Sequence, residues 1–104
     1  MTEFRPNWSD PGTDRLVQAI LALENTEEVY RFLDDICTIS EVKALAQRLQ
    51  VALMLNQEET YTYIAGVTGA STATISRVKR CLQYGAGGYK SVLPKIVQQE
   101  GKNA

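Results

Sequence analysis

Apolar residues recur at three- and four-residue spacing along most of the chain, which is the pattern of amphipathic helices. The clearest example is a stripe spaced i, i+3, i+4, i+7, made of Val29, Phe32, Leu33 and Ile36. No segment alternates convincingly between apolar and polar residues, as a half-buried strand would. We therefore predict an all-α fold of about six helices.

Capping residues predict where the first helices start. Thr13 and Asp14 open the first, Asn25 or Thr26 caps the second, and Thr38 begins the third and longest. Three glycines within residues 85–88 end the fifth helix, and Pro94 should kink or restart the last one. We expect an irregular arm over residues 1–12, one helical domain over 13–99 and a frayed end over 100–104, with fraying from Gln98 onwards.

The stretch from residue 60 to 82 has the constraints of a helix-turn-helix. With Tyr61 as the first position, the small or apolar residues that must pack the two helices together are Ile64, Ala65, Ile75 and Val78. Gly69 falls in the turn, where a positive backbone φ angle is usual and glycine adopts it at little cost.

The second helix of this motif has a face suited to a DNA groove. Ser71 or Thr72 can cap it, and an apolar stripe of Ile75, Val78 and Leu82 faces inward. The opposite face carries small or hydrogen-bonding groups followed by cations, namely Thr72, Ala73, Ser76, Arg77 and Arg80, with Lys79 beside them. That order fits a helix entering the major groove by its N-terminal end. An ordinary helical hairpin with a solvated polar face is the alternative.

The charge is strongly segregated, although the net charge is only −1. Residues 1–59 hold five Lys/Arg and eleven Asp/Glu, for a net of −6, whereas residues 60–104 hold six Lys/Arg and one Glu, for a net of +5. The basic half contains the motif, as a phosphate-facing surface requires.

Several classes of function find no support in the sequence. There is no histidine, and Cys37 and Cys81 lack metal-ligand spacing, so we expect no metal site and interpret both cysteines as small buried hydrophobes. Adjacent carboxylates such as Asp34 and Asp35 point about 100° apart on a helix. No nucleophile–base pair or cofactor loop remains, so we predict that the protein is not an enzyme. Without an apolar run of membrane-spanning length or a secretory leader, the expected location is the cytoplasm.

Two residues stand out in their surroundings. Trp8 is a large apolar group in the arm, and we expect it to dock on its own domain or on a dimer partner. Arg48 lies among the apolar residues of the third helix and needs a carboxylate, a backbone carbonyl or a ligand, unless only its stem is packed. The same helix is apolar over more than one face, which favours subunit association.

From about Leu33 to Leu93 the chain resembles the tryptophan repressor superfamily. The segments ICTISEVKALAQRLQVALML, TGASTATISRVKRCL and YGAGGYKSVL are similar to the small Trp-repressor-like proteins of the YerC/YecD group. The resemblance implies an intertwined, all-helical homodimer in which each subunit presents one helix-turn-helix. Two such recognition helices would meet successive major grooves, about 34 Å apart.

The resemblance also implies site residues. The two arginines that hold the corepressor in the family match Arg48 and Arg77, and a threonine near the ring matches Thr74. The family serine that helps hold the ligand's ammonium group matches Cys81, and a family glycine matches Val78, so both departures count against tryptophan as corepressor. We therefore expect no cofactor. Arg48 and Arg77 can instead form ion pairs with carboxylates of the protein or bind another small anion. The DNA-facing positions carried over are Tyr61, Thr62, Thr72, Ala73 and Ser76. The full set of predicted DNA-binding residues also includes Ser71, Arg77, Lys79 and Arg80.

We therefore predict a cytoplasmic, dimeric, sequence-specific DNA-binding transcription regulator of the bacterial kind, acting as a repressor. The alternative is a helical protein–protein adaptor that keeps the scaffold without specific DNA binding.

Overall fold

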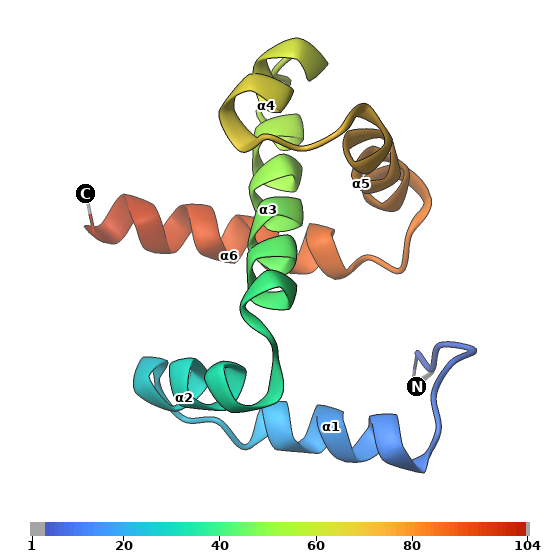
Figure 1. Cartoon of the computed structure of the whole chain (residues 1–104), viewed down its shortest axis with the longest axis vertical. Helices are drawn as coiled ribbons and strands as arrows, with labels where there is room; N and C mark the ends of the chain where they lie inside the picture. Colours follow the sequence, from blue (N-terminus) through green and yellow to red (C-terminus); the bar gives the residue numbers. More distant parts are fainter. Residues whose placement is uncertain (1–3, 104) are drawn as a thin grey trace. The chain divides into compact units, whose positions relative to one another are not determined.

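The computed structural model describes the backbone of residues 4–103 and the side chains of residues 4–101 (Figure 1). This part of the chain contains six helices and no strand, so the predicted all-α fold of about six helices is confirmed. None of these helices is long and apolar enough to cross a membrane. The chain divides into two compact units, Met1–Ile39 and Ser40–Ala104.

The first unit contains α1 (Pro11–Leu21) and α2 (Thr26–Ile36). Helix α1 starts two residues before the predicted Thr13, because Asp10 caps it and proline is well suited to the first helical position. The Asp10 carboxylate accepts a hydrogen bond from the Thr13 backbone N–H at 2.7 Å, which lowers the pKa of Asp10. Asn25 caps α2, as predicted. The irregular arm therefore ends at Asp10, and its residues 1–3 lie outside the described residues.

Neither α1 nor α2 contains a buried residue. Large apolar side chains of this unit remain exposed instead, among them Phe4, Trp8, Leu16, Val17, Ile20, Leu21, Val29, Tyr30 and Ile36. The Trp8 side chain is 66% exposed, so the first unit itself does not provide the predicted docking site. Burial of apolar area is the main force that stabilises a fold. The described residues of this unit therefore form no buried core of their own.

The second unit holds α3 (Ile39–Asn56), α4 (Tyr61–Thr68), α5 (Thr72–Tyr84) and α6 (Gly88–Asn103). All four helices contribute to one core, made of Val51, Ala52, Met54, Ile64, Ala70, Ile75, Val78 and Leu93. Helix α4 packs on α5, and α5 packs on α6 (Figure 1). The helix-turn-helix is thus built into the only buried core of the described residues.

Helix α6 differs from the prediction in two ways. It continues through Pro94 without restarting. Proline has no N–H to donate to the carbonyl four residues earlier, but Pro94 is exposed, so water can reach that carbonyl. The neighbouring Leu93 is buried in the core and holds the helix in place. It also extends to Asn103, although we predicted fraying from Gln98; Gln and Glu are good helix formers. Ala104 of the predicted frayed end lies outside the described residues.

Two glycines of α4 and its turn allow a matched test of the turn geometry. Gly69 has φ 74° whereas Gly66 lies inside the helix, and an added Cβ would meet nothing within 4 Å at either position. Gly69→Ala should cost about 1–2 kcal/mol because of its left-handed backbone. Gly66→Ala should stabilise the protein by about 0.5–1 kcal/mol. Urea unfolding midpoints measure both, and shifts in the same direction would contradict the assignment of the turn.

Candidate nucleic-acid interface and adjoining pocket

The packing of α4 against α5 follows the predicted helix-turn-helix. Ile64, Ile75 and Val78 are at most 1% exposed, and Ala65 is partly buried against the same core. Gly69 adopts the left-handed conformation, and its backbone N–H donates to the carbonyl of Ala65 at 2.9 Å. These contacts hold α5 at a fixed orientation on the unit's core.

Hydrogen bonds that the sequence did not reveal support the turn. The Thr68 hydroxyl donates to the Ile64 carbonyl at 2.8 Å and accepts from the Ala70 N–H at 3.1 Å. Gln47 of α3 donates through Nε2 to the Thr68 carbonyl at 3.1 Å. A threonine before the turn glycine is a weak signal for such a role, and Gln47 carries no local signal at all. Helix α3 is thus tied directly to the turn.

The start of α5 is capped as predicted. The Ser71 hydroxyl accepts from the Thr74 backbone N–H at 3.1 Å, and it also donates to the Thr74 hydroxyl at 3.1 Å. This places Ser71, one of the predicted DNA-binding residues, in a structural role in which its only hydroxyl proton is already donated.

The outer face of α5 brings most of the other predicted DNA-binding residues together. Its exposed side chains include Thr72, Ala73, Ser76, Arg77, Lys79 and Arg80. No ion pair between residues 4 and 101 involves Arg77, Lys79 or Arg80. Three cations therefore face solvent without a carboxylate partner, beside hydroxyl and methyl groups near the helix N-terminus.

The two predicted residues at the start of α4 behave differently from one another. Thr62 is exposed, whereas Tyr61 is half-buried and packs against the core. The Lys79 ammonium lies over the Tyr61 ring, 5.5 Å from its centroid, within reach of a cation–π interaction. Tyr61 thus presents less surface than predicted, and it helps hold Lys79 in place.

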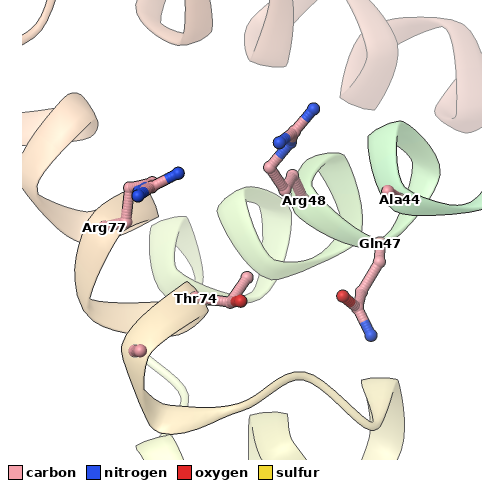
Figure 2. Close-up of a pocket in the computed structure, with 6 residues that line it drawn as sticks. Ala44, Gln47, Arg48, Thr74 and Arg77 are labelled. Atoms are coloured by element: carbon pink, nitrogen blue, oxygen red, sulfur yellow. The ribbon is translucent and has the colours of Figure 1, made fainter. Parts of the chain in front are cut away.

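A pocket of about 230 Å³ opens between α3 and α5, and it is lined by Ala44, Gln47, Arg48, Ala73, Thr74 and Arg77. In Figure 2 the Arg77 guanidinium extends in the direction of Arg48, while Gln47 points away from both arginines. Arg48 is half-buried, and neither arginine has an ion-pair or hydrogen-bond partner among the described side chains. Three of the four predicted pocket residues, Arg48, Thr74 and Arg77, therefore meet here.

Cys81, the fourth predicted pocket residue, lies elsewhere. It lines a separate hollow between α3, α5 and α6, and it is exposed, so the prediction that it is buried is wrong for the single chain. The buried stripe of α5 runs through Ile75 and Val78 towards Leu82, and Cys81 points about 100° away from Leu82. Val78 belongs to the core and not to the pocket lining. Cys37 is half-buried.

The short α4, the left-handed glycine and the exposed face of α5 define a helix-turn-helix protein. A sequence model described as Trp repressor protein matches residues 12–97. The chain belongs to this family of DNA-binding regulators, so the predicted membership of the Trp repressor superfamily is confirmed. Because members of the family are not enzymes, the prediction that this protein is not an enzyme is also confirmed.

The similar proteins include relatives of known structure. The uncharacterized protein YerC of Bacillus subtilis (strain 168) is 53% identical over 91 residues, covering 88% of each chain. A proposed Trp repressor from Staphylococcus aureus has a crystal structure that matches with a TM-score of 0.80 at 52% identity, over 85% of this chain and 88% of that one. A TrpR-like protein from Eubacterium eligens ATCC 27750 matches with a TM-score of 0.80 at 49% identity, over 84% and 90%.

Removing the tie between α3 and the turn should destabilise the protein. Gln47→Ala leaves the part-buried carbonyl of Thr68 without this donor, which should cost about 1–3 kcal/mol. Gln50→Ala is the matched control, because Gln50 lies on the same helix and is exposed. Equal urea midpoints for the two variants would mean that the Gln47 hydrogen bond contributes nothing to the fold.

Proposed function

We propose that the protein is a sequence-specific, DNA-binding transcription regulator that acts as a homodimer and represses its target. The observation that carries the proposal is the outer face of α5, where cations without carboxylate partners follow small polar residues at the helix N-terminus. The family is one of DNA-binding regulators, which supports the same role. Such a role belongs in the cytoplasm, where the chromosome is accessible.

The arrangement suggests how the two tasks of recognition are divided. In the proposed complex the exposed Lys79 and Arg80 meet phosphates, which would fix the register of the protein on the duplex. Thr72, Ala73 and Ser76 are placed to test base edges through hydroxyl and methyl groups. Because these side chains cannot make the strong bidentate contact that arginine makes with guanine, water and DNA shape should carry part of the specificity.

Both the packing of the first unit and the family support the proposed dimer. None of residues 4–39 is buried, so a second copy is the proposed source of a covering surface for the α1–α2 unit. A two-fold dimer places two α5 helices against successive major grooves, about 34 Å apart. The operator should then be a palindrome.

The arginine pocket is proposed to take a small anion, with tryptophan a poor fit. Arg48 and Arg77 offer ten guanidinium N–H donors in principle, about five each, and no described carboxylate uses them. The family serine that helps hold the ammonium group of tryptophan is replaced here by Cys81. Cys81 lines the separate hollow between α3, α5 and α6. Arg77 borders both the pocket and the DNA-facing surface, so an anion held there would compete with phosphate for it.

Arg80→Ala tests whether the outer face of α5 meets phosphates. The variant should bind all duplexes more weakly by a similar factor and should lower the slope of log affinity against log salt by about one. Lys95→Ala, an exposed cation of α6 away from the motif, is the control and should keep the parent slope. Fluorescence anisotropy at several salt concentrations gives both quantities. A parent-like slope for Arg80→Ala would remove this residue from the interface.

Tryptophan should leave DNA affinity unchanged. The expected result is the same anisotropy midpoint with and without millimolar tryptophan, because the family serine that helps hold the ammonium group is replaced by Cys81, which lies outside the pocket. A midpoint that falls tenfold or more on adding tryptophan would show that the pocket accepts the amino acid and that the assignment of Cys81 is wrong.

A further inference from the structure

The arm before α1 is held in a defined conformation. Arg5 binds both carboxylate oxygens of Asp14 through Nη2, at 3.1 and 2.9 Å, and the Ser9 N–H donates to the Pro6 carbonyl at 3.0 Å. Within this turn the Trp8 side chain remains 66% exposed. A large aromatic group on a preorganised segment loses little conformational entropy when it docks, which favours a role in binding.

A receptor of matching chemistry lies in the second unit. We call it the α5–α6 hollow, and its lining consists of Leu49, Cys81, Ala86, Gly88, Tyr89 and Val92. None of these residues is charged, and the volume is about 470 Å³. A dry apolar cavity of roughly 150 Å³ can hold a benzene ring, so the hollow has room for an indole.

The two units also carry opposite charges. Residues 1–39 hold three Lys/Arg and eight Asp/Glu, a net of −5, and residues 40–104 hold eight Lys/Arg and four Asp/Glu, a net of +4. Opposite charges attract the first unit of one copy to the second unit of another and help to orient their encounter.

We propose that the arm of one copy inserts Trp8 into the α5–α6 hollow of a second copy. The inference rests on the homodimer of the proposed function and names a contact within it. A second copy is the occupant because Trp8 is exposed within its own unit, none of residues 4–39 is buried, and the two units carry opposite charges. The contact brings the arm next to Cys81 of the second copy, so a cysteine introduced into the arm can form a disulfide with it.

Disulfide trapping tests this contact directly. In a Cys37→Ser background, Asn7→Cys keeps Trp8 and adds one thiol beside it, so that the only thiols are this one and the native Cys81. Oxidised glutathione serves as the oxidant. A disulfide requires Cα atoms about 4.4–6.8 Å apart, so the expected product is a covalent dimer on a non-reducing gel. Tyr30→Cys in the same background is the control, since Tyr30 is 74% exposed on α2, and it should remain monomeric on the gel.

Each other outcome overturns a defined part of the proposal. A disulfide within one chain would show that the arm docks on its own molecule. No disulfide, or equal cross-linking of the Tyr30→Cys control, would exclude the hollow as the receptor. Sedimentation of the reduced parent protein separates the two proposals: a monomer contradicts the dimer of the proposed function, whereas a dimer that fails to cross-link contradicts only the arm contact.

A second measurement uses Trp8 as the single tryptophan of the chain. Its fluorescence should be blue-shifted in the dimer and should move to the red on dilution. Val92→Glu places a charge in the hollow and should give the red-shifted spectrum and at least about tenfold weaker dimerisation, as expected for loss of a buried tryptophan anchor. Val97→Glu is the control, on the same helix and 47% exposed against 44% for Val92. Parent-like spectra for both variants would overturn the contact.

Discussion

The close packing of α4 on α5 is the constraint on which the rest of the structure depends. Ile64, Ile75 and Val78 exclude water between the two helices, and Gly69 permits the turn that brings them together. Gln47 then fastens the turn to α3 by one hydrogen bond. Because the orientation of α5 is fixed in this way, its polar outer face is presented as a unit, and the pocket beside it has defined walls.

This packing leaves the chain with an unequal distribution of burial. The second unit has a core to which every one of its helices contributes, whereas the first has exposed apolar side chains and no buried residue. The acidic charge is concentrated in the first unit and the basic charge in the second. The proposed DNA contact rests on the basic second unit, and the proposed dimer rests on the exposed apolar side chains of the first.

The sequence predicted the helix-turn-helix well because its constraints are local. Ser71, Gly69 and the spacing of Ile75 and Val78 each act within a few residues, and the structure has all of them where expected. Thr74 and Arg77 share a helix face by their i, i+3 spacing, so their meeting in one pocket is also local in origin.

Features that depend on distant neighbours could not be predicted in this way. The exposure of Cys81 and Trp8 is decided by what other elements cover, and no periodicity encodes it. The hydrogen bond from Gln47 joins residues 21 positions apart. The apolar surroundings of Arg48 indicated that it needs a partner, but its place in a pocket with Arg77 came from the resemblance to a family. Pro94 was expected to interrupt α6, but the burial of Leu93 outweighs its local effect.

The most direct test of sequence-specific DNA binding is selection from random duplexes by the purified parent protein at near-physiological salt. The account predicts enrichment of a palindromic sequence whose half-sites lie about one helical turn apart, without any added ligand. A folded, dimeric protein that enriches no sequence under these conditions, while still binding duplexes indiscriminately or not at all, would contradict it.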